Sequence, residues 1–160
     1  MKLYHGSNLK IENINLDKSK KGKDFGRGFY LSDNYSQAYK MACLTTDRLG
    51  FGSPIVSEYD FDESCLEDCS IKVKKFDEYT EEWAQFILDN RTNELEFNIH
   101  NYDIVIGPIA DDKVGYQIRR FIYGDITVKQ LISELKYRKG LSIQYLFATD
   151  VAIKLLNSSK

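Results

Sequence analysis

The sequence predicts an α+β fold in a single domain spanning residues 1–160. A chain of 160 residues suits one domain with one core. Its 42% apolar and 29% charged residues are typical of a globular protein rather than a disordered one. Segments with strand and helix periodicity alternate irregularly along the chain, which favours α+β over a doubly wound α/β sheet.

The first third of the chain predicts two strands and a helix. Residues 2–5 read as a short strand that enters a Gly-Ser-Asn turn at 6–8. Residues 17–24, DKSKKGKD, form a polar loop. The aromatic and apolar segment 28–31 suits a strand. The Ser-Asp-Asn after it supplies the N-cap of a helix at about 34–44.

The middle of the chain predicts a loop, two strands and a helix. The glycine-containing segment 47–53 is typical of a loop. Apolar and polar residues alternate over 55–61 and again over 71–75, as in strands with one wet face. A helix at about 80–90 begins after Thr80, a suitable cap, and turns its large apolar residues inward.

The last third predicts a buried strand and two helices, then a strand and a short helix. The strand at 102–106 stops at a Gly-Pro pair, and a helix at about 111–122 follows. Gly124 closes that helix, and Thr127 caps the next one. The remaining elements are a strand at 142–147 and a terminal helix capped by Thr149.

Composition narrows the classes of protein. The net charge of −2, with positive and negative residues interleaved, argues against affinity that comes mainly from neutralising phosphates, although a local basic patch stays open. Three cysteines form no disulfide framework, and Cys65 and Cys69 lack a second ligand pair for zinc. No signal peptide and no apolar run of membrane-spanning length is visible, so we expect a cytoplasmic protein without metal or membrane association.

Two clusters could carry chemistry. His5 lies near the end of a strand, directly before Gly6, which lets a ligand approach the backbone, and Ser7, which adds a hydroxyl. The second histidine, His100, lies in a polar stretch, and we interpret it as structural. The residues alone therefore predict a pocket between His5 and Tyr30.

The second cluster is the segment 24–30, DFGRGFY, in which two glycines precede aromatic residues. A Gly-x-Gly pair is weak evidence by itself, and the segment lacks the continuation of a dinucleotide fingerprint and the ending of a phosphate-binding P-loop. No Gly-x-Ser-x-Gly elbow and no His-Glu-x-x-His helix is present. The acidic run at 60–63 is more typical of a solvated surface than of a catalytic pair.

Three motifs in order resemble the DUF3990 family, which is placed in the ADP-ribosyltransferase-like superfamily. They are LYHGS at 3–7, DFGRGFYLS at 24–32 and YDIVIGPIADDKV at 102–114, and the resemblance extends from residue 3 to about 156. It implies a split β-sandwich flanked by helices, with a His-Tyr-Glu pattern on three strands.

The resemblance also implies how NAD would be bound. His5 would hydrogen-bond the adenosine-side ribose, the backbone of Gly6 would reach the nicotinamide amide, and Tyr30 would stack on the nicotinamide ring. Gln144 would take the third position, where the superfamily has a catalytic Glu, and would bond the ribose without supplying charge. Arg27, in the Gly-Arg-Gly turn that ends at Gly28, is a candidate donor to the pyrophosphate.

The implied function is mono-ADP-ribosyl transfer from NAD to a macromolecular acceptor, protein or nucleic acid, with release of nicotinamide. Another acid, Glu134 or Glu58, could supply the missing charge. The small format resembles bacterial toxin–antitoxin or phage-defence effectors, which would imply a neutralising antitoxin protein. Two alternatives stay open, an NAD- or ADP-ribose-binding module without transfer and an NAD glycohydrolase.

Overall fold

A computed structural model of the protein describes residues 1–110, 112–136 and 142–158. The strands are β1 (Lys2–Ser7), β2 (Phe29–Ser32), β3 (Ile55–Phe61), β4 (Val73–Lys75), β5 (Ile104–Pro108), β6 (Ile143–Phe147) and β7 (Leu156–Ser158). The α-helices are α1 (Tyr35–Leu49), α2 (Glu81–Arg91), α3 (Asp112–Ile122), α4 (Val128–Lys136) and α5 (Asp150–Ile153). Two short 3-10 helices, η1 (Leu16–Lys18) and η2 (Glu63–Glu67), lie in connections.

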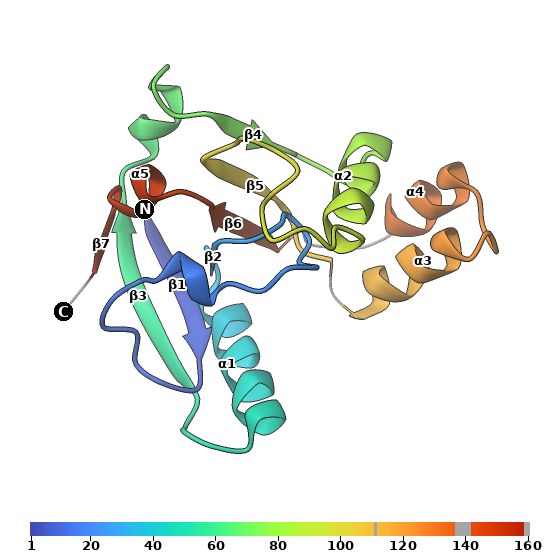
Figure 1. Ribbon diagram of the computed structural model, residues 1–160. Helices are drawn as coiled ribbons and strands as arrows, with labels where there is room; N and C mark the ends of the chain where they lie inside the picture. The colour runs from blue at the N-terminus through green and yellow to red at the C-terminus, as the bar shows by residue number, and fades with distance from the viewer. Residues whose placement is uncertain (111, 137–141, 159–160) are drawn as a thin grey trace.

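All seven strands belong to one mixed sheet with the order β4-β5-β6-β2-β1-β3-β7 (Figure 1). The pair β4–β5 is parallel and the other pairs are antiparallel. β1 pairs with β3 along its whole length. Its junction with β2 is much shorter, with Tyr4 opposite Ser32 as the registered pair among the described residues. The sheet is therefore weakly joined at its centre, between β2 and β1.

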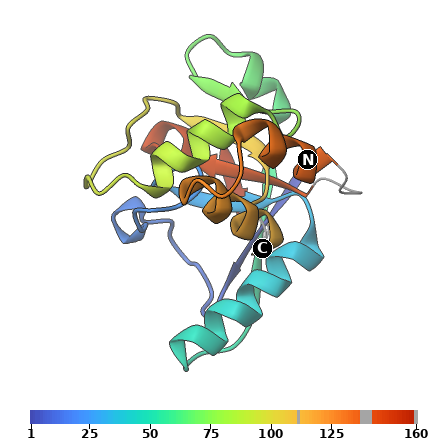
Figure 2. The same cartoon turned by 90° about the vertical axis from the view of Figure 1, so that its right-hand side faces the viewer.

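Two core clusters cover the sheet, one on each face. Helices α2, α3 and α4 pack over β5, β6 and β2, around the fully buried Trp83 and Leu146 (Figures 1 and 2). The opposite face packs under η1, η2 and α5, around the buried Leu3 and Phe147. Because side chains alternate along a strand, β2, β5 and β6 each contribute to both clusters.

Helix α1 packs on the strand that carries His5. Asn34 caps it by accepting a hydrogen bond from the backbone N–H of Gln37, and Gly50 ends it in the left-handed conformation with φ of 72°. At Gly6 the helix comes so close that a Cβ would overlap with the carbonyl oxygen of Ala38 and lie 2.8 Å from the nitrogen of Ala42. Gly6 is therefore required for helix packing.

The structure confirms the α+β class and most predicted elements. The caps at Thr80, Thr127 and Thr149 each accept a backbone hydrogen bond as expected. Gly124 has a φ of 77° and ends α3, as the sequence indicates. Residue 111, where we expect that helix to begin, lies outside the described residues, as do residues 159 and 160 of the predicted domain.

Several predicted boundaries were wrong, and one strand was missed. Gly6 and Ser7 continue β1, because they pair with Val56 and Ile55 of β3. The first three residues of the predicted loop at 47–53 belong to α1, which runs to Leu49 and is capped by Gly50.

Two more errors lie further along the chain. β5 runs through Gly107 and Pro108, because Pro108 pairs with Ile143 at the end of the strand. β7 was missed altogether. It is three residues long and is recognisable only by its pairing with the edge of β3.

Candidate functional site

The fold places the three residues of the predicted pattern on neighbouring strands. His5 lies on β1, Tyr30 on β2 and Gln144 on β6, and these strands are adjacent in the order β6-β2-β1. Ser32 pairs with both Tyr4 and Gln144. Directly paired residues share a face, as do residues two apart, so Tyr30 and Gln144 lie on the face covered by α2. His5 follows Tyr4, the partner of Ser32, by one residue, so its side chain lies on the opposite face of the sheet.

His5 bridges the short junction between β1 and β2. Its Nδ1 lies 2.7 Å from the carbonyl oxygen of Tyr30, and its ring stacks on Phe29 with the centroids 4.3 Å apart. Burial lowers the pKa of His5, and the bond to that carbonyl offsets part of the shift. A carbonyl only accepts, so Nδ1 carries the proton and the neutral ring keeps Nε2 as an acceptor. Among the described residues nothing bonds Nε2, which suits a ribose hydroxyl.

The Tyr30 hydroxyl ties β2 to the turn that precedes it. It donates to the carbonyl of Gly26 at 2.7 Å and accepts from the backbone N–H of Phe25 at 3.0 Å. Burial, followed by the nearby Asp24 carboxylate, raises the pKa of this hydroxyl well above its usual value. The ring packs against the α2 side core while remaining partly exposed. Tyr30 thus has a fixed orientation rather than a free one.

Gln144 is oriented by two acceptors. Its Nε2 donates to Asp24 Oδ2 at 3.2 Å and to the carbonyl of Pro108 at 3.5 Å. Since both partners only accept, the amide nitrogen must face them and the carbonyl Oε1 must face away. Oε1 has no hydrogen-bond partner within the described chain, although Gln144 is only 9% exposed. Oε1 can therefore accept a hydrogen bond from a hydroxyl group of a ligand.

Asp24 is the residue that sequence reasoning missed. Its Oδ2 accepts from Gln144, and its Oδ1 accepts from Arg91 Nε at 2.7 Å and pairs with Arg91 Nη2 at 2.7 Å. The Asp24 side chain is 15% exposed. Its position at the start of the DFGRGFY motif was a signal, but nothing in the sequence places that loop over β6.

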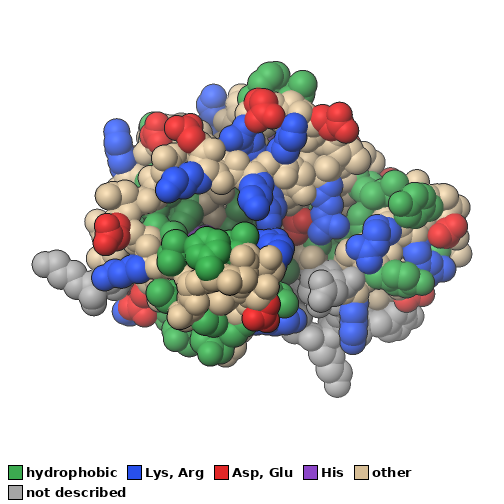
Figure 3. Space-filling model, turned by 60° about the horizontal axis from the view of Figure 1, so that its bottom comes forward, with side chains coloured by type: hydrophobic (Ala, Val, Ile, Leu, Met, Phe, Trp, Pro, Cys, Tyr) green, Lys and Arg blue, Asp and Glu red, His purple; other side chains and the backbone are tan. Residues whose placement is uncertain are grey.

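Figure 3 shows Lys and Arg side chains gathered in the hollowed middle of one face, with acidic side chains among them.

The other two acids proposed from the sequence lie elsewhere. Glu58 is on β3, where it pairs with Lys2. Glu134 lies on α4 with an exposed side chain. Neither contacts Gln144 among the hydrogen bonds of the described residues, so Asp24 is the carboxylate that the fold brings to this position.

The three remaining candidates near the strands have structural roles. Gly6 faces α1, as described above, and Ser7 pairs with Ile55 at the end of β1. Gly28 has a φ of 155°, and a Cβ there would overlap with Leu146 and lie 2.6 Å from the carbonyl of Phe147. Its backbone thus packs on β6, which leaves no room on that side for a ligand.

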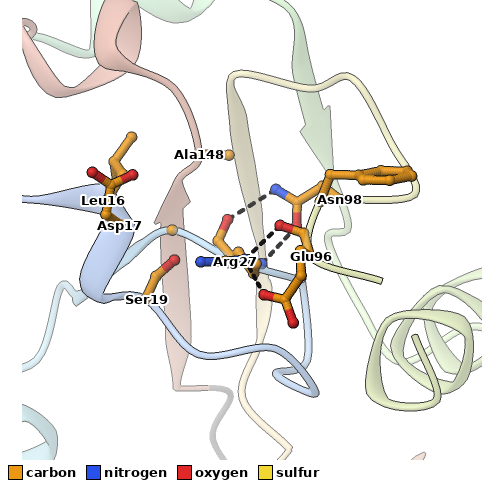
Figure 4. Close-up of a pocket in the computed structure, with 9 residues that line it drawn as sticks. Leu16, Asp17, Ser19, Arg27, Glu96, Asn98 and Ala148 are labelled. Atoms are coloured by element: carbon orange, nitrogen blue, oxygen red, sulfur yellow. Dashed lines mark hydrogen bonds and ion pairs between the residues drawn. The ribbon is translucent and has the colours of Figure 1, made fainter. Parts of the chain in front are cut away.

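Arg27 lies at a different place from Gln144. It lines a pocket of about 330 Å³ together with Leu16, Asp17, Ser19, Gly28, Glu96, Phe97, Asn98 and Ala148 (Figure 4). Its guanidinium pairs with Glu96, and its backbone N–H donates to Asn98 Oδ1 at 2.6 Å. Gly28 is four residues from the Ser32–Gln144 pair, roughly 13 Å along the strand. Arg27 thus lies away from Gln144, and its hydrogen bonds and ion pair within the described chain go to Glu96 and Asn98.

His100 has the structural role expected of it. Its Nε2 donates to the carbonyl of Phe25 at 2.8 Å, and its Nδ1 accepts from the backbone N–H of Tyr102 at 3.2 Å. Burial lowers its pKa, which keeps the ring neutral for both bonds. His100 therefore holds the turn that carries Asp24.

Two classes of feature have no candidate in the described part of the chain. No group of three or more His, Cys, Asp or Glu side chains there could hold a metal ion. No helix among residues 1–110, 112–136 and 142–158 is both long and apolar enough to cross a membrane.

Comparisons with known proteins give one match. The model of a family described as "Protein of unknown function (DUF3990)" matches residues 1–158. A search of the curated proteins and a search of the solved structures each found no match.

Proposed function

The chain belongs to the DUF3990 family, and we propose that it is an NAD-dependent mono-ADP-ribosyltransferase whose site lies where β1, β2 and β6 meet. The proposed substrates are NAD and a macromolecular acceptor. The resemblance to the ADP-ribosyltransferase-like superfamily suggests this reaction. Two observations support it: Tyr30 and Gln144 lie on one face of the adjacent strands β2 and β6, and His5, from the other face of the neighbouring strand β1, bonds the backbone carbonyl of Tyr30.

One observation carries the proposal. The superfamily pattern has a glutamate at the third position, and this chain has Gln144 with the Asp24 carboxylate at 3.2 Å. The pair contains the two functions that one glutamate would provide. Gln144 Oε1 would accept a hydrogen bond from the ribose 2′-hydroxyl, and Asp24, which bonds the same amide group, would supply negative charge beside the reacting ribose.

The chemistry follows from these groups. The bond between the nicotinamide nitrogen and ribose C1′ breaks, and its electron pair leaves with nicotinamide. The ribose develops positive charge, which a nearby carboxylate stabilises more strongly in a site shielded from water than in solution. The acceptor atom then bonds C1′ and loses its proton. His5 Nε2, an acceptor, would hold the second ribose of NAD.

A second candidate function is an NAD- or ADP-ribose-binding module without transfer. The Arg91 guanidinium favours it, because it pairs with Asp24 and neutralises part of the charge that the reaction needs. Hydrolysis of NAD is the third candidate, in which water takes the place of the acceptor.

One assay separates these functions. The protein is incubated with NAD labelled in the adenosine half, with and without cell lysate, and nicotinamide release and label on protein and nucleic acid are measured. Transfer predicts release and label together, and hydrolysis predicts release alone. NAD binding without release would overturn both enzyme functions.

The Tyr30→Ala variant tests the location of the site in the same assay. It should abolish NAD binding or turnover, whereas Tyr123→Ala, at a side chain that is 79% exposed on the end of α3, should leave both unchanged. Unchanged behaviour of Tyr30→Ala would refute the site.

A further inference from the structure

A group of cations adjoins the Asp24–Gln144 pair, and we propose that Lys23, Arg48, Arg91 and Arg119 form a binding site for the phosphate groups of a nucleotide ligand. This inference rests on the proposed function only for the identity of that ligand. The site itself is argued from charge and geometry.

The cations come from four separate segments of the chain. Lys23 lies in the loop before β2, Arg48 in the last turn of α1, Arg91 at the end of α2 and Arg119 in the last turn of α3. Because the segments are far apart in sequence, only the fold brings these charges together.

The pKa of the Lys23 ammonium reflects the positive charges around it. Burial lowers its pKa, and the nearby charges of Arg48, Lys20 and Arg91 lower it further, while Asp24 alone among its charged neighbours raises it. A partly buried ammonium with three cationic neighbours and one carboxylate is destabilised by repulsion. A bound anion would remove this repulsion, so the arrangement suits a site that is completed by its ligand.

Two guanidinium groups converge at the surface of α3. A Cβ placed on Gly115 would lie 3.7 Å from Arg119 Nη1 and 3.8 Å from Arg91 Nη1. The absence of a side chain at Gly115 leaves room between them. Guanidinium forks match the geometry of phosphate oxygens and bind them with paired, charge-assisted hydrogen bonds.

Few acids neutralise this group. Within the described part of the chain, Arg91 pairs with Asp24, whereas Lys23, Arg48 and Arg119 have no salt bridge. The nearby basic side chains Lys21 and Arg27 differ, because both pair with Glu96. The proposed site therefore retains an excess of positive charge in a protein whose net charge is −2.

The position of the site identifies the ligand class. Asp24 bonds Gln144 with one carboxylate oxygen and Arg91 with the other, so the cations begin directly beside the residue proposed to hold a ribose. A phosphate attached to that ribose would reach them. The diphosphate of a dinucleotide and the backbone of a nucleic acid strand share this chemistry.

The test uses inorganic pyrophosphate as the probe and calorimetry as the measurement, on the full chain at two salt concentrations. The native protein should bind pyrophosphate, and more weakly at high salt. The double variant Arg48→Gln with Arg119→Gln should bind at least tenfold more weakly. The control, Arg120→Gln, changes the next residue of α3, whose guanidinium bonds Gln117 and stacks on Tyr116, and should change the affinity less than twofold.

Two further titrations identify the source of the phosphate. Parallel weakening of ADP-ribose binding in the double variant indicates a dinucleotide diphosphate. Parallel weakening for a single-stranded 12-nucleotide RNA indicates a nucleic acid backbone. The inference is overturned if the native protein does not bind pyrophosphate at millimolar concentration, or if native and double variant bind it equally.

These outcomes are independent of NAD cleavage. Pyrophosphate binding that follows the expected pattern without any nicotinamide release would refute the enzyme and leave the phosphate site standing. Nicotinamide release at equal rates in the native protein and the double variant, with no pyrophosphate binding, would refute the phosphate site alone.

Discussion

The carboxylate of Asp24 links Gln144 on β6 to Arg91 at the end of α2. One oxygen accepts from the amide nitrogen of Gln144 at 3.2 Å and the other from Arg91 Nε at 2.7 Å. Arg91 and Gln144 are more than 50 residues apart in the sequence. In the fold, the loop that carries Asp24 joins them through its carboxylate.

Replacing Asp24 by Asn removes the charge and keeps the size. We expect NAD binding to change less than about threefold and nicotinamide release to fall roughly 10²–10³-fold, the usual effect of losing one electrostatic contact to a transition state. Glu96→Gln, which removes a carboxylate from an exposed ion pair, is the control and should release nicotinamide at the native rate. Equal loss of binding and release in Asp24→Asn would contradict a role confined to the reaction.

Replacing Gly6 by Ala should destabilise the protein. The new Cβ would overlap with the carbonyl oxygen of Ala38, so α1 must shift away from β1, at a cost of about 1–3 kcal/mol in the free energy of unfolding measured in urea. Gly115→Ala is the matched control. Its Cβ would make ordinary contacts with the side chains of Arg119 and Arg91, and we expect a gain of roughly 0.5–1 kcal/mol from helix propensity. A neutral Gly6→Ala would disprove the close approach.

Stability should fall as the pH drops below about 6.5. The pKa values of His5 and His100 are both lowered in the folded protein by burial, so the unfolded chain takes up these protons first. The stabilisation is complete above the unfolded pKa and is lost toward lower pH, by up to about 1.4 kcal/mol per pH unit for each histidine. Urea unfolding between pH 7.5 and 5.5 measures it.

The His100→Asn variant serves as the control for this pH dependence. Removal of one titrating group should reduce the slope of stability against pH by about half. A slope that is unchanged by the substitution would assign the pH dependence to other groups.

Replacing Tyr30 by Phe leaves two backbone groups without their partner. The N–H of Phe25 and the carbonyl of Gly26 both bond the hydroxyl, so we expect a loss of about 1–3 kcal/mol and faster proteolysis within 17–28. Tyr123→Phe, at an exposed position, should change neither quantity. Unchanged proteolysis of Tyr30→Phe would show that the turn is held by other contacts.

Replacing Arg27 by Ala tests the phosphate role that the sequence suggested. Its guanidinium is engaged by Glu96 in a pocket away from Gln144, so the dissociation constant for NAD, measured by calorimetry, should change less than about twofold. A tenfold weaker affinity for NAD in this variant would show that Arg27 takes part in NAD binding.

The sequence determined most of the elements, and several of their ends, through local chemistry. Thr80, Thr127 and Thr149 cap helices because a hydroxyl before a helical segment satisfies an exposed backbone N–H, and that contact needs no distant partner. The alternation along 55–61 likewise predicts β3, since a strand with one buried face must alternate. The family resemblance placed His5, Tyr30 and Gln144 on strands, and the strands are there.

Only the tertiary structure decided which side chains meet. Asp24 meets Gln144 and Arg91 because the loop before β2, the strand β6 and the end of α2 pack together, and the guanidinium of Arg119 on α3 approaches that of Arg91. No local pattern in the sequence records such long-range packing. The same packing explains Gly6, which reads as a ligand contact in the sequence and contacts α1 in the fold. Local patterns depend on neighbours in the chain, whereas a site depends on how distant segments pack, and that depends on the whole core.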